Sequence, residues 1–347
     1  MNIAILVTDF NLKKPMHATV RLARELTNGG HSVWFFTADG FSLGADDRLS
    51  IVGVKVPVKT FRSNRTYLET LQSCPSEKIT TAELDVLFLR DNPARYTQDR
   101  SWARQAVALF SRFAVDQGVL VLNDPTGLTL AQNKLYFQTL PPKVRSKTLI
   151  TRNPQDIREF AEELDGDLIL KPLQGSGGES VFLVKKGSTY NFNQLVESSL
   201  KIGYVIAQEY LPAAEEGDIR LYLMNGNPLQ KNGHYAAFRR RRSGDDIRSN
   251  MHAGGQVEAA VITPEVLDLC AQVKSRIVED GLFLVGLDIV GDKIIEVNVF
   301  CPGGLNSMEK IEGVNFSAPI CKEIERKFKV HSTQPNGLDN RTLATMA

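Results

Sequence analysis

Short apolar runs alternate with a helical pattern at the start of the chain. Residues 3–7 form an apolar run that ends in polar residues, as a buried parallel strand does. Residues 20–26 place apolar side chains at helical spacing, and a pair of glycines follows them. A second apolar run covers residues 33–37. Together these segments predict a strand–helix–strand unit.

The same alternation continues through the first third of the chain. Further strands are predicted at residues 51–56, 84–89 and 119–122. A helical pattern lies at residues 102–113, and residues 43–78 are otherwise irregular. We therefore expect an α/β domain with an open parallel sheet over residues 1–124. Arg90 follows one of its strands, at the sheet edge where ligands gather in such folds.

The pattern changes after residue 124. Helices are predicted at residues 126–140, after Asn153 and after Thr263, and strands at residues 168–170 and 205–207. Residues 284–290 and 293–299 predict a β-hairpin with a Gly-Asp turn between its strands. The residues from 331 to 347 are polar and contain proline and glycine, so we expect a flexible tail there.

Composition excludes several classes of protein. Hydrophobic residues make up 42% and charged residues 23%, and 41 basic residues balance 40 acidic ones. This balance gives no reason to expect nucleic acid or a membrane surface as partner. The four cysteines have no paired spacing, which argues against a disulfide framework or a zinc site. The N-terminus does not resemble a signal peptide, and we expect a cytoplasmic protein with small-molecule partners, with a homo-oligomer left open.

The predicted hairpin carries three oxygen-bearing side chains. Glu296 and Asn298 are two residues apart in one strand and leave the same face, which Asp288 reaches from the other strand. Carboxylate and amide oxygens suit Mg²⁺. The spacing alone also fits an ordinary polar hairpin face. The aliphatic residues around these carboxylates favour a metal site, because unpaired charge is costly there.

A glycine-rich loop follows a predicted strand end. Lys171 ends the strand, and the loop contains Gly175, Ser176, Gly177 and Gly178. Such a loop lets backbone N–H groups approach a phosphate closely. Its spacing matches neither the P-loop nor the dinucleotide fingerprint. A plain glycine-rich turn therefore remains equally open.

Two more segments are candidates for binding. The run Gln208, Glu209, Tyr210 and Leu211 ends a strand, where it could meet a nucleotide base and ribose or simply form a turn. An arginine-rich stretch contains Arg220, Arg240 and Arg248, and arginine binds carboxylates and phosphates in pairs of hydrogen bonds. A solvated basic face is the alternative for that stretch.

In this order, the segments resemble the ATP-grasp superfamily, and most closely the bacterial glutathione synthetases. The resemblance covers nearly the whole chain. It is carried by the strings ILKPLQGSGG, AQEYLPA, EGDIR, NMHAGG and FLVGLDIVGD. It implies an ATP-grasp fold with a two-lobed nucleotide-binding region over residues 125–330, including a lid at about residues 148–212.

The resemblance also implies a role for each matching residue. The residues implied to bind ATP are Lys134, Lys171, Gly175, Ser176, Gly177, Gly178, Gln208, Glu209, Tyr210, Leu211 and Asp218. Those implied to bind Mg²⁺, or Mn²⁺ in its place, are Asp288, Glu296 and Asn298. Those implied to surround the acyl phosphate or the substrate carboxylates are Arg220, Arg240, Arg248, Asn250, Arg90, Gly254 and Gly255. Independently of the resemblance, Gly303 and Gly304 have no side chains, which leaves room for an acceptor larger than glycine, and backbone N–H groups near the following helix could hold the acceptor carboxylate. The implied reaction joins a carboxylate to an amine through an acyl phosphate, with γ-glutamylcysteine and glycine as substrates.

The segment after Asn298 departs from the family pattern. Glutathione synthetases usually have Thr-Ser-Pro one residue later, whereas this chain has Phe300, Cys301 and Pro302. The stretch that follows is closer to the ligases that add glutamate to a ribosomal protein. Two alternatives therefore stay open, namely a related ligase with another donor or acceptor and a non-catalytic ATP-binding module like the synapsins.

Overall fold

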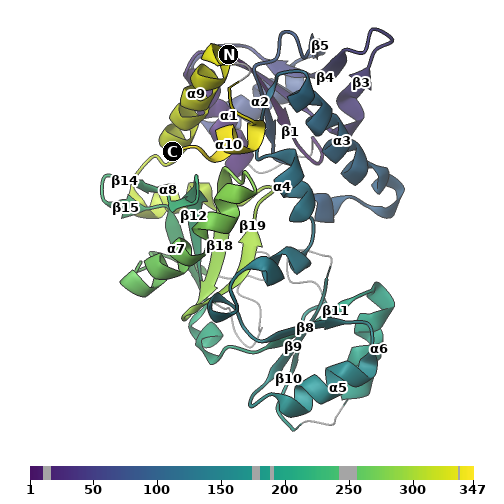
Figure 1. Ribbon diagram of the computed structural model, residues 1–347. Helices are drawn as coiled ribbons and strands as arrows, with labels where there is room; N and C mark the ends of the chain where they lie inside the picture. Colours follow the sequence, from purple (N-terminus) through teal and green to yellow (C-terminus); the bar gives the residue numbers. More distant parts are fainter. Residues whose placement is uncertain (11–16, 174–179, 188–190, 242–255, 335–336) are drawn as a thin grey trace.

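The computed structural model describes residues 1–10, 17–173, 180–187, 191–241, 256–334 and 337–347. Within these ranges, three larger β-sheets follow one another along the chain, and a two-stranded pair accompanies the third. In Figure 1 the N-terminal sheet lies at the top, the sheet with β12, β18 and β19 in the middle, and the sheet β8–β11 at the bottom. No helix within these ranges is long and apolar enough to cross a membrane.

The N-terminal sheet has seven strands, most of them in the order β3-β4-β2-β1-β6-β7, with β5 beside β4. Its strands are β1 (Asn2–Leu6), β2 (Ser32–Phe36), β3 (Phe41–Leu43), β4 (Leu49–Val56), β5 (Ser76–Thr80), β6 (Val86–Leu89) and β7 (Leu120–Leu122). Its helices are α1 (Ala18–Asn28), α2 (Asn64–Ser73) and α3 (Trp102–Asp116). Strands β2, β1, β6 and β7 are parallel, and their buried apolar runs explain why they were predictable. The irregular region expected at residues 43–78 instead contains α2 and β5, because β5 pairs with the long strand β4.

The middle of the chain forms a four-stranded antiparallel sheet, ordered β10-β9-β11-β8. Its elements are β8 (Thr148–Thr151), α5 (Pro154–Glu163), β9 (Leu168–Pro172), β10 (Phe182–Val184), α6 (Phe192–Ile202) and β11 (Val205–Glu209). The side chain of Asn153 accepts a hydrogen bond from the backbone N–H of Gln155 and caps α5, as the sequence predicts. This small sheet has a hydrophobic core of its own.

The third sheet has its main strands in the order β17-β16-β12-β18-β19. Its strands are β12 (Asp218–Met224), β13 (Asn227–Pro228), β16 (Ala237–Arg241), β17 (Gln256–Glu258), β18 (Leu284–Val290) and β19 (Lys293–Asn298). A separate pair is formed by β14 (Gln230–Lys231) and β15 (His234–Tyr235). The helices are α7 (Pro264–Glu279), α8 (Leu305–Glu312), α9 (Ser317–Thr333) and α10 (Asn340–Thr345). Strands β18 and β19 form the predicted hairpin.

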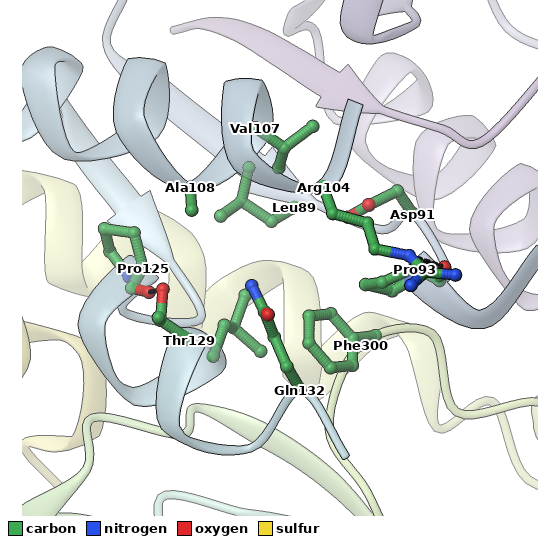
Figure 2. Close-up of a pocket in the computed structure, with 11 residues that line it drawn as sticks. Leu89, Asp91, Pro93, Arg104, Val107, Ala108, Pro125, Thr129, Gln132 and Phe300 are labelled. Atoms are coloured by element: carbon green, nitrogen blue, oxygen red, sulfur yellow. Dashed lines mark hydrogen bonds between the residues drawn. The ribbon is translucent and has the colours of Figure 1, made fainter. Parts of the chain in front are cut away.

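The predicted helix over residues 126–140 is two shorter elements. Helix α4 (Pro125–Leu130) ends first, and a 3-10 helix (Lys134–Thr139) follows it. Asn133 caps the second element by accepting a hydrogen bond from the backbone N–H of Leu135. A capping residue between them restarts the helical turn, so Lys134 stands at the beginning of an element. Helices α3 and α4 face each other across a small cavity (Figure 2).

Asn123 joins the N-terminal sheet to the third sheet. Its side-chain amide donates to the backbone oxygens of Leu284, at 3.2 Å, and Val299, at 2.6 Å. Its side-chain oxygen accepts from the backbone N–H of Leu284 at 2.8 Å. Because all three bonds are buried, they fix the end of β7 against both strands of the hairpin.

The expected tail is wrong, because residues 340–345 form helix α10 on the edge of the N-terminal sheet. The side chain of Asn340 exchanges hydrogen bonds with the backbone of Val121, at 2.9 and 3.0 Å, and donates to Asp124 at 2.8 Å. Lys327 is fully buried and donates to the backbone oxygens of Leu343 and Met346. These polar contacts compensate for the low apolar content that suggested a tail.

We expect the substitution Asn340→Ala to lower the free energy of unfolding by about 1–3 kcal/mol, because it leaves the buried N–H and C=O of Val121 without partners. Urea unfolding followed by circular dichroism measures the change. The matched control is Lys322→Ala on the exposed side of α9, which should have little effect. An Asn340→Ala protein as stable as the control would contradict the docking of α10.

Candidate active site

One face of the third sheet brings together the side chains predicted to bind metal. Asp288 lies directly opposite Glu296 on the neighbouring strand. Two residues away, Gly286 lies opposite Asn298. On the other side of β18, Arg220 of β12 lies opposite Asp288. Because directly opposed residues of antiparallel strands leave the same face, these polar side chains form one row.

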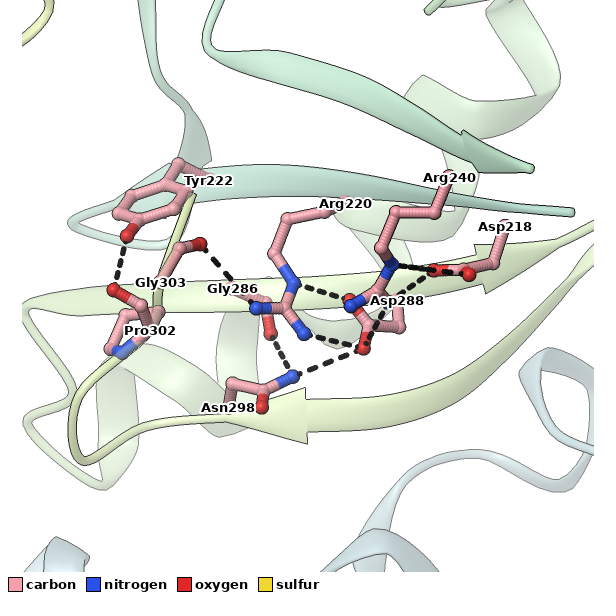
Figure 3. A network of polar contacts seen from close by, with 9 residues as sticks. All are labelled: Asp218, Arg220, Tyr222, Arg240, Gly286, Asp288, Asn298, Pro302 and Gly303. Carbon is pink, nitrogen blue, oxygen red and sulfur yellow. Dashed lines mark hydrogen bonds and ion pairs between the residues drawn. The ribbon is translucent and has the colours of Figure 1, made fainter. Parts of the chain in front are cut away.

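The centre of this row is a buried cluster of two arginines and two aspartates (Figure 3). The carboxylate of Asp288 is 2% exposed and accepts two bonds from Arg220, at 2.5 and 2.6 Å. Arg240 lies 2.8 Å from the same carboxylate and also donates to Asp218, with Nε 3.0 Å from Oδ2. Burial would raise the pKa of Asp288, but Arg220 and Arg240 outweigh it and hold that pKa below its usual range. Asp288 is therefore a carboxylate held ionised inside the protein.

Glu296 has a different electrostatic environment. Burial and the neighbouring charge of Asp288 raise the pKa of Glu296, against the opposing effect of Arg220 and the lysines Lys134 and Lys171. Like charges directly opposite each other in a sheet repel. The pair of carboxylates therefore favours an additional cation beside Glu296.

Asn298 completes the predicted set. Its side-chain NH₂ donates to the backbone oxygen of Gly286 at 3.3 Å and to Asp288 at 3.4 Å. These bonds turn its side-chain oxygen away from both acceptors (Figure 3). Within the described parts of the chain, no three residues among His, Cys, Asp and Glu are arranged to hold a metal ion. The set that we consider instead combines two carboxylates with an amide oxygen, all hard donors of the kind that Mg²⁺ accepts.

Two lysines approach this face from other parts of the chain. Lys171, at the end of β9, donates to the side-chain oxygen of Gln208 at 2.7 Å. Burial lowers the pKa of Lys171 to about 8, with Lys134 lowering it further and Glu296 opposing both. Lys134 donates to the backbone oxygen of Pro172 at 3.2 Å, and burial lowers its pKa as well. The two ammonium groups and the Glu296 carboxylate therefore interact electrostatically, although they come from distant parts of the sequence.

The end of β11 and the two residues after it lie beside Lys171. Gln208 is buried, and its NH₂ donates to the Thr148 hydroxyl at 3.1 Å. The Glu209 carboxylate accepts from the backbone N–H of Lys147 at 3.2 Å. Tyr210 follows β11, and Leu211 immediately precedes the 3-10 helix Pro212–Glu216. This segment is therefore anchored to β8 and to Lys171 through its side chains.

The loop after β19 is held by residues that the sequence analysis did not connect. Arg90 is buried and donates to the backbone oxygen of Pro302 at 3.2 Å. The hydroxyl of Tyr222 donates to the same oxygen, and Arg220 donates to that of Gly303 at 3.4 Å. No sequence signal identified Tyr222, because its role depends on the register of β12 against β18.

The lack of a side chain at Gly304 predicts room for a ligand, but the structure leaves no such room there. A Cβ atom there would lie 2.3 Å from the ring of Phe238, and the φ angle is +102°. Only glycine meets both conditions easily, so Gly304 is required for packing at the start of α8. A Cβ on Gly303 would meet nothing within 4 Å among the described atoms, so the expected room exists at that position.

Several residues implied by the resemblance lie outside the described residues. They are Gly175, Ser176, Gly177, Gly178, Arg248, Asn250, Gly254 and Gly255. The described residues form two groups. Around the loop after β19 and the buried cluster at Asp288 lie Arg90, Arg220, Arg240, Asp218, Gly303 and Gly304. On the side of Glu296 lie Lys134, Lys171 and Gln208.

Comparison with known families gives two matches that together span most of the chain. Residues 1–129 match the family model described as prokaryotic glutathione synthetase, N-terminal domain. Residues 133–313 match the model described as prokaryotic glutathione synthetase, ATP-grasp domain.

Individual relatives agree with these models. The chain is 31% identical over 338 residues to a glutathione synthetase of Synechococcus elongatus, covering 94% of this chain and 98% of the relative. It is 33% identical over 311 residues to that of Brucella melitensis, covering 89% and 93%.

Solved structures show the same fold at low sequence identity. The ATP-grasp ligase PsnB, complexed with minimal precursor, Mg and ADP, has a TM-score of 0.58 at 17% identity, covering 94% of this chain and 97% of that one. The D-alanine-D-alanine ligase of Coxiella burnetii has a TM-score of 0.58 at 11% identity, covering 96% and 97%. The predicted ATP-grasp fold is confirmed.

We expect Glu296→Gln to stabilise the ligand-free protein near neutral pH by up to about 1 kcal/mol, the size of a cross-strand pair effect. The raised pKa means that the folded protein binds more protons at Glu296 than the unfolded chain does. The stability from this group therefore falls as the pH rises through the raised pKa, and glutamine removes that fall.

Urea unfolding at several pH values measures this effect, with Glu279→Gln on the exposed side of α7 as the control. A Glu296→Gln protein less stable than the wild type near pH 7 would show that Arg220, Lys134 and Lys171 outweigh the repulsion and burial of Glu296 in the ligand-free protein.

Proposed function

Since the chain belongs to the prokaryotic glutathione synthetase family of ATP-grasp, ADP-forming ligases, we propose that it joins γ-glutamylcysteine to glycine. In this reaction a carboxylate oxygen of the donor attacks the γ-phosphorus of ATP, and ADP leaves. The acceptor amine then attacks the acyl carbon, and inorganic phosphate leaves. The observation that carries the proposal is the meeting of Glu296 with Lys134 and Lys171 beside the Asp288 cluster.

The charged groups divide between the two halves of Mg²⁺–ATP. Lys134 and Lys171 bind phosphate oxygens, because each ammonium group is partly buried and its charged form is disfavoured without an anion. Asp288, Glu296 and Asn298 would hold Mg²⁺, or Mn²⁺ in its place, through oxygen atoms. When bound, the metal ion neutralises charge on the phosphates during phosphoryl transfer. The pKa of Glu296 stays raised despite Arg220 and the two lysines, which fits an additional cation at this position.

The remaining residues position the nucleotide and the reacting groups. Gln208, Glu209, Tyr210 and Leu211 contact the base and ribose, because they follow the strand end beside Lys171. Asp218 supports the nucleotide side by fixing Arg240. Arg220 and Arg240 keep Asp288 ionised and present positive charge to the acyl phosphate. Little covalent help is needed, so orientation and charge dominate the catalysis.

For the residues outside the described ranges, the proposal rests on the family resemblance of the sequence. Residues Gly175, Ser176, Gly177 and Gly178 cover the phosphates. The stretch with Arg248, Asn250, Gly254 and Gly255 contacts the substrate carboxylates and the acyl phosphate. Closure of both stretches would keep water from hydrolysing the intermediate.

The loop after β19 contributes to the acceptor side. Arg90 acts on substrate through this loop, since it holds the oxygen of Pro302. Gly303 leaves open space beside the loop, and the backbone at Gly303 and Gly304 near the start of α8 faces the acceptor carboxylate. Phe300 and Cys301 stand where the family usually has hydroxyl side chains. This difference favours one second candidate, a ligase of the same family with an acceptor other than glycine.

We expect ADP release to require γ-glutamylcysteine and to rise severalfold when glycine is added. Phosphate transfer makes the acyl phosphate, and only the amine discharges it efficiently. A coupled ADP assay with glycine, its amide and other small amino acids measures this. The Glu296→Gln protein, folded but without a metal-binding carboxylate, should show no turnover. A higher rate with an acceptor larger than glycine would favour the second candidate, a ligase of the same family with another acceptor.

We expect Lys171→Ala to raise the KM for ATP by roughly 10- to 100-fold and to lower kcat, since a charge-assisted contact of about 1.5–3 kcal/mol is lost. Steady-state kinetics with varied ATP measures the change. Lys186→Ala is the matched control, because Lys186 is an exposed lysine of the same lobe that pairs with Asp165. Unchanged ATP kinetics in Lys171→Ala would place Lys171 outside the phosphate site.

A further inference from the structure

A small cavity of about 20 Å³ lies at the carboxyl end of β6 (Figure 2). Leu89 and Asp91 line it from the N-terminal sheet, Val107 and Ala108 from α3, and Phe300 from the segment after β19. Its size suits a group about as large as one water molecule. Because most of the lining is apolar, a polar side chain in the cavity requires an explanation.

Asp91 is the carboxylate in this cavity. Its side chain is 1% exposed, and Oδ2 accepts a hydrogen bond from the Tyr96 hydroxyl at 3.1 Å. Oδ1 is buried without a hydrogen-bond partner among the described residues. Burial raises the pKa of Asp91 to about 6, so the group is mostly ionised near neutral pH. A buried carboxylate oxygen without a donor is costly, and a ligand with N–H groups would remove that cost.

The other charged side chain at the cavity does not provide this donor. Arg104 of α3 donates to the backbone oxygens of Pro93, at 2.9 Å, and Tyr96, at 3.5 Å. It contributes positive charge to the wall, but no ion pair between it and Asp91 is found in the described structure. From α4, Thr129 and Gln132 contribute uncharged side chains.

The cavity adjoins the proposed catalytic face. Phe300 follows the proposed metal ligand Asn298 by two residues, a span of about 7 Å in extended chain. Arg90, directly before Asp91, holds the carbonyl of Pro302 in the same loop. The segment at residues 300–302 therefore contacts both the cavity and the residue next to Asp91. Only this short segment of chain lies between the lining of the cavity and the proposed metal ligand Asn298.

We propose that Asp91 and this cavity bind the ammonium group of an amino-acid substrate, an inference that rests on the proposed ligase function. An ammonium group has the size of a water molecule and carries three donors. Its bond to a carboxylate is charge-assisted and therefore strong. The small size of the cavity excludes larger polar groups. The donor carries an ammonium group as its α-amino group, whereas the acceptor amine has to be unprotonated and free to attack the acyl carbon.

The test compares the wild type with Asp91→Asn, which keeps the shape and an oxygen for the Tyr96 hydroxyl but removes the charge. We expect at least a tenfold rise in KM for γ-glutamylcysteine and unchanged KM values for glycine and ATP. N-acetyl-γ-glutamylcysteine should be a poor substrate for the wild type, and Asp91→Asn should lose that discrimination. A rise in the KM for glycine alone would contradict the inference.

Two further variants separate binding from folding. Asp85→Asn changes an aspartate at the opposite end of β6, which accepts from the backbone of Asn2, and should leave both KM values unchanged. Ala108→Leu fills the cavity from α3 without changing a polar group and should raise the same KM as Asp91→Asn. Thermal unfolding checks that each variant is folded.

The pH dependence provides an independent readout. In the wild type, kcat/KM for the affected substrate should fall below about pH 6 as Asp91 is protonated. Arg104 also lines the cavity, and Tyr96 donates its hydroxyl hydrogen bond to the carboxylate. Burial raises the pKa of Tyr96, so its hydroxyl stays un-ionised in that range. Asp91→Asn should lack this fall.

The outcomes distinguish this inference from the proposed function. If wild type and variants all fail to release ADP with any donor, the ligase proposal itself fails. If Asp91→Asn and Ala108→Leu are active with unchanged KM values for both substrates, the cavity holds only water and the inference is overturned.

Discussion

The pairing of Asp288 with Arg220 and Arg240 is the interaction on which the rest of the site depends. Burying an isolated carboxylate costs several kcal/mol, and each removed partner would leave a charge uncompensated. Here the aspartate and both arginines come from three adjacent strands, β18, β12 and β16. Their bonds fix the register of those strands and the direction of each side chain. Glu296 and Asn298 then face the ligand side because β19 pairs with β18.

A second constraint sets the distance between the sheets. Asn123 binds the backbone at both ends of the β18–β19 hairpin, and Arg90 binds the loop that follows it. Both residues stand at the carboxyl ends of strands of the N-terminal sheet, where their side chains point out of that sheet. The loop after β19 is therefore determined by the N-terminal domain as much as by its own sequence. A change in this loop would alter the position of the proposed substrate site relative to the proposed metal ligands.

Much of this arrangement could be predicted from the sequence, but its polar partners could not. The hairpin and the shared face of Glu296 and Asn298 follow from periodicity, which is local information. The pairing of Arg220 with Asp288 depends on strand register across 68 residues of chain. Helix α10 was missed because its docking depends on Asn340, whose partners lie 219 residues earlier. Long-range polar complementarity has no periodic signature in a single sequence.

Under the proposed function, the charges of Glu296 and the lysines in the ligand-free site explain why nucleotide binding is favourable. Burial disfavours the charged forms of Glu296 and Lys171, raising one pKa and lowering the other. Neither shift would persist beside a complementary ligand, because a cation lowers the pKa of a carboxylate and a phosphate raises that of an ammonium group. Mg²⁺–ATP supplies both charges at once. By contrast, Asp288 already has its counter-charges, so it provides a fixed reference point, while Glu296 and the lysines respond to the ligand. A site divided in this way can hold its geometry before binding and still gain free energy from the nucleotide.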